Sequence, residues 1–333
     1  MSLIFKILAS LLLLLMLVIG WGWLDYQNSL ATPITKETVL FEIKRGDSFN
    51  RITDNLISHK IDISPWWFKL YAYQNNYTQQ LKAGEYLIKP DLKVNEILSL
   101  FVNGKAKQYS ITFPEGWTFK QILQKLAQHE KIKPTLNGLS DKAILNKIDN
   151  QEKHPEGLFF PDTYHFHKNT TDLSLLKRAY IKMQQILKEQ WQTKATGLPI
   201  KTPYEALILA SIVEKETGKP SERQTIAGVF SRRLLKGMKL QTDPTVIYGM
   251  GDTYKGDIRF KDLRTPTPYN TYTINGLPPT PIAMPGKEAI YAALHPEAGK
   301  SLFFVSRGDG SHVFSESLKA HNNAVNKYQR KSK

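Results

Sequence analysis

The sequence of 333 residues contains no cysteine, which excludes disulfide bonds and thiol chemistry. It also contains no glycine-rich loop of the phosphate-binding type. His165 and His167 alternate on an expected strand, but neither has an acidic or histidine partner at zinc-binding spacing. We therefore expect neither a cofactor nor a metal site.

Acidic side chains are scarce, since 30 Asp and Glu stand against 45 Lys and Arg and give a formal net charge of +15. Such a balance favours an anionic partner, which is nucleic acid, anionic lipid or an acidic polymer. The choice among these three depends on the compartment in which the chain works.

Long apolar runs are limited to one, near the N-terminus. Residues 7–24 carry no charged side chain, and their helix would span about 27 Å, close to the hydrocarbon thickness of a bilayer. Lys6 precedes the run and Asp25 follows it, which favours a cytoplasmic N-terminus. The alternative is a signal peptide cleaved at Ser29-Leu-Ala31, but the run is longer than a usual signal core. We expect an uncleaved anchor and a body outside the membrane, where nucleic acid is a poor partner.

A weak internal repeat follows the anchor. Residues 39–56 and 109–126 each read as a short alternating strand, a glycine turn and a helix with apolar positions three and four apart. A second pair of similar segments surrounds Gly84 and Gly157. The pattern predicts two small βα modules in tandem.

The first module, residues 38–103, has the strand–turn–helix opening of a LysM-like module, a class that binds N-acetylglucosamine polymers. The alternative is a spacer of the same topology that holds the next domain away from the bilayer, and both interpretations stay open. Several aromatic residues are candidates for stacking on sugars, although we expect at least half to be core: Trp66, Trp67, Tyr71, Tyr73 and Tyr77.

Two glutamates lie two residues apart near the end of an expected apolar helix over residues 204–218. Glu216 continues the apolar face at helical spacing, whereas Glu214 lies about 200° around the helix. A carboxyl on an apolar face is costly to ionise, so the pKa of Glu216 should rise, as a general acid near neutral pH requires. The alternative is that Glu216 only ends the helix, with Gly218 as its stop.

Polar groups recur downstream. The cluster from Gln241 to Asp243 predicts a turn or a helix start, and its functional interpretation is a set of hydrogen-bonding groups lining a cleft. Residues 264–281 are rich in proline, tyrosine, asparagine and threonine, which favours an extended groove wall for an uncharged sugar. The alternatives are a turn role for Asn270 and a packed core role for Tyr272.

Four segments in this order closely resemble the MltG/YceG family of endolytic murein transglycosylases: residues 210–217, 240–249, 269–273 and 276–279. The resemblance covers nearly the whole chain and includes a final Ser311-His-Val-Phe314 followed by His321-Asn322. It implies cleavage of peptidoglycan strands within the chain, between N-acetylmuramic acid and N-acetylglucosamine. The C6 hydroxyl of muramic acid attacks its own C1 and leaves a 1,6-anhydro ring, so one carboxyl suffices for both proton transfers.

The resemblance also suggests site residues. Related transglycosylases carry the catalytic glutamate before Ser or Thr, which Glu216 matches, with Glu214 as the alternative. Gln241, Asn270 and Tyr272 are predicted to position the sugars by hydrogen bonds. The expected partners are peptidoglycan strands, the cytoplasmic membrane and, by family inference, peptidoglycan synthases.

We therefore predict an α+β protein of the bacterial inner membrane, single-pass, with its C-terminal body in the periplasm. The expected parts are a cytoplasmic N-terminus, a transmembrane helix, a LysM-like module, a second βα segment with a connecting helix, and a mixed α/β catalytic domain with a Glu-bearing helix: residues 1–6, 7–24, 38–103, 104–196 and 197–333. The competing function is a non-catalytic, membrane-anchored scaffold that binds peptidoglycan.

Overall fold

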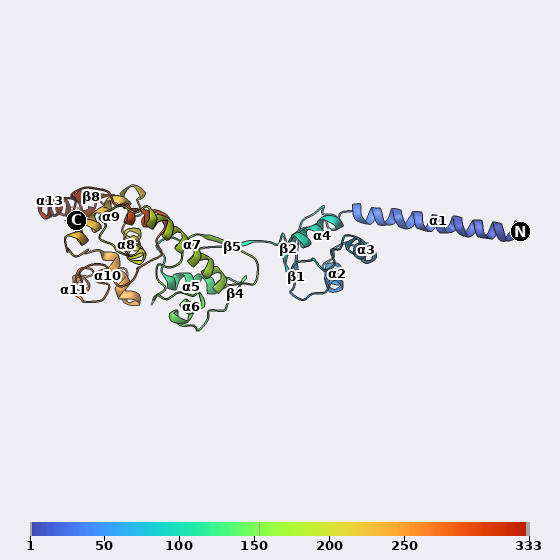
Figure 1. Cartoon of the computed structure of the whole chain (residues 1–333), viewed down its shortest axis with the longest axis horizontal. Helices are drawn as coiled ribbons and strands as arrows, with labels where there is room; N and C mark the ends of the chain where they lie inside the picture. The colour runs from blue at the N-terminus through green and yellow to red at the C-terminus, as the bar shows by residue number, and fades with distance from the viewer. Residues whose placement is uncertain (1, 153, 331–333) are drawn as a thin grey trace. The chain divides into compact units, whose positions relative to one another are not determined.

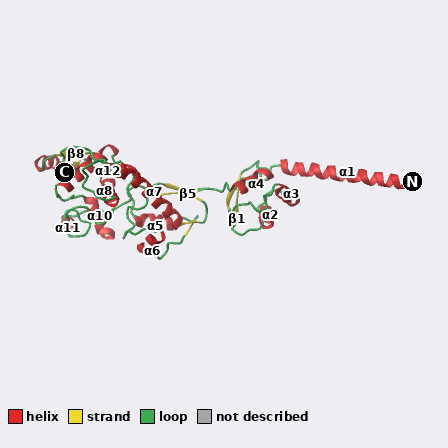
Figure 2. Ribbon diagram, in the orientation of Figure 1, coloured by secondary structure: helices red, strands yellow, loops and turns green. Residues whose placement is uncertain are grey.

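The computed structural model describes residues 2–152 and 154–330 (Figure 1). The chain divides into two units, of which the first runs to Tyr109 and adds His165–Asn169. The second holds Ser110–Tyr164 and the chain from Thr170 onward. Both predicted segments 104–196 and 197–333 thus fall mainly in the second unit. The structure is a mixture of helices and short strands with an apolar N-terminal helix, as predicted (Figure 2).

The N-terminal helix α1 (Ser2–Ala31) is longer than the apolar run within it. Its apolar side chains up to Leu24 are exposed, and the helix is long and apolar enough to cross a membrane. Its last turns behave differently, because Tyr26 is buried and donates a hydrogen bond from its hydroxyl to Gln74 Oε1 (2.8 Å). Trp67 Nε1 donates to Asp25 Oδ2 (2.7 Å). The helix therefore continues past the apolar run and packs on the helix α3 (Pro65–Gln74) of the first unit.

The rest of the first unit surrounds one apolar core. Its strands β1 and β2 pair antiparallel, with Val39 opposite Ile88 and Ile43 opposite Gly84. Core side chains come from both strands and all three short helices, and include Phe41, Leu56, Phe68, Tyr86 and Phe101. In chain order the elements are β1 (Val39–Ile43), α2 (Phe49–Ser58), α3 (Pro65–Gln74), β2 (Gly84–Ile88) and α4 (Val94–Asn103).

The aromatic residues of this unit divide between core and surface. Trp66 and Tyr73 are 83% and 64% exposed. Trp67, Tyr71 and Tyr77 are partly buried. Three of the five thus pack partly inside, and two on α3 remain open to a partner.

The opening of the predicted repeat is present in both copies. Gly46 and Gly116 both have left-handed φ angles, 88° and 73°, which a side chain would disfavour. Two residues later, Ser48 and Thr118 each accept a hydrogen bond from the third backbone N–H of the helix that follows, so both act as N-caps. The second pair differs, because Gly157 has a positive φ (79°) and Gly84 starts a strand.

The first half of the second unit comprises short strands and three helices. The strands β3 and β5 pair with each other, and β4 pairs parallel with β6. The chain passes between the two units within β3 and β5. In order the elements are β3 (Tyr109–Thr112), α5 (Phe119–Ala127), β4 (Ile132–Lys133), α6 (Asp141–Lys147), β5 (Thr163–Phe166), β6 (Thr170–Thr171) and α7 (Asp172–Gln192).

The second half is built around α8 (Pro203–Glu216), whose residues from Ala206 to Val213 are all buried and which packs against α9 (Arg223–Leu235) and α12 (Lys287–Leu294). The prediction of a single apolar face was therefore incomplete, because α8 is a central core helix that is buried on all its faces. Its chain ends extended at Thr217, without a left-handed glycine. The other elements are α9 (Arg223–Leu235), α10 (Asp243–Met250), α11 (Phe260–Arg264), α12 (Lys287–Leu294), the antiparallel pair β7 (Phe303–Ser306) and β8 (His312–Ser315), and α13 (Leu318–Val325).

Candidate active site

Glu216, the last residue of the core helix α8, lines a cavity of about 420 Å³ in the second unit. The start of α10, the β7–β8 hairpin and α13 supply the other walls. The polar lining includes Arg233, Gln241, Asp243, Tyr272, His312 and His321. A core helix that ends at a cavity places its terminal carboxyl at the boundary between the protein interior and an open space.

The carboxyl of Glu216 is electrostatically unusual. Burial raises its pKa to about 7, and the nearby charge of Asp243 acts in the same direction. Thr242 opposes this shift by donating from Oγ1 to Glu216 Oε2 (2.7 Å), and the neighbouring His312 and Arg233 also lower the pKa. A carboxyl with a pKa near 7 is well populated in both protonation states at neutral pH. It suits a group that first gives a proton and then takes one.

Glu214 has a different environment, although it stands only two residues earlier. Its Oε2 accepts from the backbone N–H of Gly286 (3.0 Å), and its Oε1 lies 3.6 Å from Arg223 Nη2. Burial raises the pKa of Glu214 as well. It is not among the residues that line the Glu216 cavity. The helix thus directs the two glutamates to separate surroundings, as the 200° separation predicts.

Two of the three predicted sugar-positioning residues line the cavity with Glu216. Gln241 has a left-handed φ of 52°, and its Oε1 accepts from Arg233 Nη1 (3.3 Å). Tyr272 donates from its hydroxyl to Asp243 Oδ1 (2.7 Å). The structure therefore brings Gln241 and Tyr272 to Glu216 from separate segments of the chain.

Asn270 lies apart from the cavity and is fully buried. Its Nδ2 donates to three backbone carbonyl oxygens within residues 262–265, and its Oδ1 accepts from the backbone N–H of Tyr272 (2.9 Å). All of its amide atoms are engaged with the backbone. It holds the loop that carries Tyr272, which agrees with the turn interpretation of this residue.

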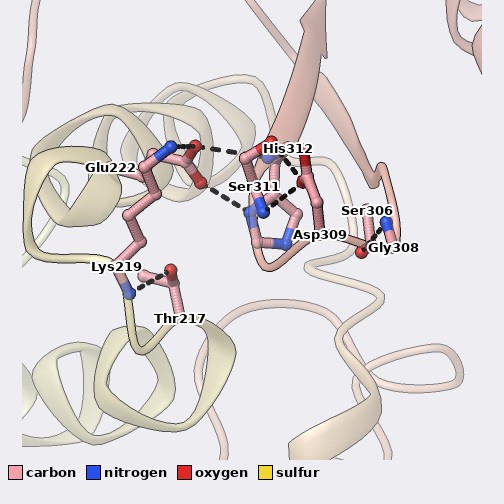
Figure 3. Close-up of polar contacts among 8 residues, drawn as sticks. All are labelled: Thr217, Lys219, Glu222, Ser306, Gly308, Asp309, Ser311 and His312. Carbon is pink, nitrogen blue, oxygen red and sulfur yellow. Dashed lines mark hydrogen bonds and ion pairs between the residues drawn. The ribbon is translucent and has the colours of Figure 1, made fainter.

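Sequence reasoning gave no role to the hydrogen-bonded pair of Glu222 and His312 (Figure 3). His312 lines the cavity, and its Nδ1 lies 2.7 Å from Glu222 Oε2 while its backbone N–H donates to Glu222 Oε1 (3.2 Å). Burial alone would raise the pKa of Glu222, but the bonds from His312 and Lys219 hold it below its usual range. The only signal in the sequence was the motif Ser311-His-Val-Phe314, to which no role was attached.

His321 is a second histidine that sequence reasoning left without a role. It lines the same cavity, and its ring stacks on Phe303 with centroids 5.3 Å apart. Within the described residues, its buried Nδ1 has no hydrogen-bond partner. A buried polar atom without a partner is costly, so this nitrogen is available to a ligand or a water molecule.

A second and larger cavity, of about 1060 Å³, lies in the same unit and is lined by a further glutamate, which is buried. Glu156 is 3% exposed, and burial raises its pKa to about 7. Its Oε1 accepts from the first backbone N–H of α5, that of Phe119 (2.9 Å), and its Oε2 accepts from the Tyr248 hydroxyl (3.1 Å). Glu156 therefore joins α5 to α10. Sequence reasoning used this residue only as part of the repeat.

Comparison with known proteins gives a consistent picture. The chain matches the model of the YceG-like family over residues 41–327. It is 32% identical to the endolytic murein transglycosylase of Bacillus subtilis (strain 168) over 94% of this chain and 91% of that protein. The protein of the same name from Streptococcus pneumoniae serotype 2 is 29% identical over 89% of this chain and 60% of its own length. A crystal structure of a yceG-like protein from Listeria monocytogenes has 31% identity and a TM-score of 0.54, covering 87% of this chain and 99% of that chain.

Proposed function

Because this chain belongs to the YceG-like family, we propose that it cleaves peptidoglycan with Glu216 as the single proton-transferring group. The activity is that of an endolytic lytic transglycosylase, a lyase that cuts between N-acetylmuramic acid and N-acetylglucosamine within the strand. The observation that supports this role for Glu216 is its position: a carboxyl with a pKa raised to about 7 lines a cavity beside Gln241 and Tyr272.

The reaction needs one group that is acid and then base. Protonated Glu216 gives its proton to the glycosidic oxygen as the bond from that oxygen to C1 of the muramoyl unit breaks. The resulting carboxylate removes the proton of the C6 hydroxyl, and O6 forms the new bond to C1. The proton count balances without water, and Glu216 returns to its protonated form. The Thr242 hydroxyl, bonded to Glu216 Oε2, holds the carboxyl in place.

The walls of the cavity supply groups that orient the sugar. The Gln241 amide and the Tyr272 hydroxyl offer hydrogen bonds, and the Asp243 carboxylate offers negative charge to the oxocarbenium-like transition state. Asn270 acts indirectly in this scheme, because it holds the backbone of Tyr272. His312 is held by Glu222 through its Nδ1 and forms part of the same wall.

We assign the chain to the bacterial inner membrane with its body in the periplasm. An uncleaved anchor is supported by the packing of α1, because cleavage after Ala31 would remove Tyr26 from the first unit. It would also remove the Asp25 carboxylate that binds Trp67. A single membrane helix also offers a surface for peptidoglycan synthases, which we keep as proposed partners.

The first unit is proposed to be a LysM-like module that binds glycan. The strand, the left-handed Gly46 and the capped α2 support the topology, and the exposed Trp66 and Tyr73 offer rings to a sugar. The spacer interpretation makes no use of these rings. Glycan binding by the full chain with Trp66→Ala and Tyr73→Ala distinguishes the two, since only a binding module loses affinity.

Mass spectrometry of uncrosslinked glycan strands digested by the full chain in detergent tests the activity. We expect shorter strands ending in 1,6-anhydro-muramic acid, with a size distribution that reports internal cutting. Reducing ends that carry an added water would instead mean a hydrolase. Binding without cleavage would favour the scaffold.

A further inference from the structure

The larger cavity of the second unit has no role in the proton transfers, yet it adjoins the Glu216 cavity. Lys215 lines the larger cavity and the next residue, Glu216, lines the smaller one. In the same way Pro244 lines the larger cavity and Asp243 the smaller one. The end of α8 and the start of α10 thus form walls of both spaces, so a substrate held at Glu216 has the larger cavity next to it.

The aromatic rings of the larger cavity are already engaged with protein. Tyr248 and Tyr269 contact each other edge to face, with centroids 4.8 Å apart. Their hydroxyls are bonded to Glu156 and to Thr280 Oγ1 (2.9 Å). Phe119 is 3% exposed and stacks on Phe159. This cavity therefore does not present the open aromatic faces on which a pyranose ring stacks.

What the cavity does present is charge of both signs and amides. The α5 helix contributes Lys120, Gln121 and Gln124, all exposed. Lys120 Nζ bonds both oxygens of Asp252 across the cavity (2.8 and 2.9 Å), and Lys215 Nζ donates to the carbonyl of Gly116 (3.2 Å). Such an exposed ion pair contributes little to stability and exchanges readily for ligand groups. Carboxylates, an amine and amides are the groups that this lining matches.

We propose that the cavity between α5 and α10 binds the peptide stem that peptidoglycan carries on its muramoyl units. The inference rests on the proposed function, since it assumes a muramoyl sugar at Glu216. The stem leaves that sugar toward the larger cavity, where Lys120 and Lys215 bind its carboxylates and the glutamines of α5 bind its amides. Glu156 is a positioning residue here, because it joins the start of α5 to Tyr248 and so fixes the two walls.

Steady-state cleavage of two substrates tests this proposal: uncrosslinked strands with intact stems, and the same strands after the stems are removed by an amidase. The full chain carries Lys120→Glu, which reverses the charge at the cavity, or Leu123→Trp, which fills it. We expect the ratio of KM for stem-bearing strands to KM for stem-free strands to rise about tenfold in both variants. Lys120→Glu loses a charged hydrogen bond to the stem, and in Leu123→Trp the indole ring occupies the space of the stem. Lys125→Glu is the matched control, because it lies exposed on the same helix, does not line the cavity, and should leave the ratio unchanged.

Each other outcome has a definite meaning. An equal rise of KM for both substrates would overturn the proposal and assign the cavity to sugars. Unchanged KM for both substrates would show that the cavity binds no part of the strand. If the wild-type chain cuts neither substrate, the proposed function itself fails, and binding of isolated stem peptide to wild type and Lys120→Glu then decides the cavity alone.

Discussion

The second unit contains two glutamates, Glu156 buried and Glu216 half-buried, whose pKa values are raised alike but whose surroundings are very different. The pKa values of Glu216 and Glu156 both rise to about 7, in both cases because burial disfavours the charged form. Glu216 accepts a hydrogen bond from the Thr242 hydroxyl and lines a cavity together with Gln241 and Tyr272, which are proposed to bind the sugar. Glu156 accepts from the start of a helix and from a tyrosine, and so joins two elements. A raised pKa thus reports burial, and the remaining contacts decide between catalysis and architecture.

The largest effect is expected when the proposed catalytic carboxyl of Glu216 is replaced. Glu216→Gln keeps the size of the side chain and its contact with Thr242 but has no proton to transfer. We expect cleavage to fall about 100- to 10,000-fold, as for loss of a general acid, with the thermal unfolding temperature at pH 4.5 little changed, because Glu216 is protonated there in the folded chain. Anhydro-ended products measured over time provide the rate.

Glu214→Gln is the control on the same helix. Since this carboxyl faces Gly286 and Arg223 rather than the cavity, most of the activity should remain. If the two results are reversed, Glu214 is the acid and the assignment of Glu216 is wrong.

The dependence of the free energy of unfolding on pH tests whether the pKa values of Glu156 and Glu216 are raised alike. Folded Glu156 keeps its proton until about pH 7, whereas in the unfolded chain it titrates near its ordinary value of 4.5. The folded chain therefore binds more protons in this window, so the free energy of unfolding falls as pH rises from 4.5 to 7. Glu156→Gln should remove up to about 3 kcal/mol of this fall, measured by urea unfolding at several pH values.

Glu216→Gln should flatten the same window by a similar amount, because its shift has the same cause. A slope that persists unchanged in Glu156→Gln would show that Glu156 titrates at its ordinary pKa in the folded chain.

A smaller effect is expected from the bond that distinguishes Glu216. Wild-type activity should decline as pH rises through about 7, because the acid loses its proton. Thr242 lowers this pKa by its hydrogen bond, so Thr242→Val should move the alkaline limb of the rate profile upward by about one pH unit. The valine has the same shape, and Thr242 makes no side-chain capping bond to α10. A limb that moves downward would contradict the geometry.

The smallest effect concerns the bond that distinguishes Glu156. Tyr248→Phe removes one donor from the carboxyl while the ring keeps its contact with Tyr269. We expect a loss of about 1 kcal/mol in the free energy of unfolding. Chemical denaturation at pH 6 gives the value, with Tyr291→Phe as a control on an exposed tyrosine of α12. Equal losses in both variants would show that the hydrogen bond from Tyr248 to Glu156 adds nothing to the free energy of unfolding.

Local signals in the sequence predicted much of this structure. The glycine and the capping residue predicted the openings of α2 and α5, because a left-handed turn and an N-cap are properties of a few adjacent residues. Helical geometry likewise separated Glu214 from Glu216. The family resemblance is confirmed by the comparisons.

Contacts between segments that are distant along the chain could not be predicted from the sequence. Glu222 and His312 are 90 residues apart, and no periodicity connects them. Glu156 reaches Tyr248 across 92 residues. Asn270 was predicted to bind sugar because of its amide side chain. It is instead fully buried, and its amide bonds to the backbone, which the sequence alone did not reveal.

The continuity of α1 with the first unit has a mechanical consequence. Asp25 and Tyr26 follow the apolar run directly and are already bound to α3, so no free linker separates the apolar turns of α1 from the rest of the first unit. Rotation of the helix about its own axis must then rotate the module with it. A protein that binds the apolar turns of the proposed membrane anchor therefore also fixes the rotational orientation of the first unit.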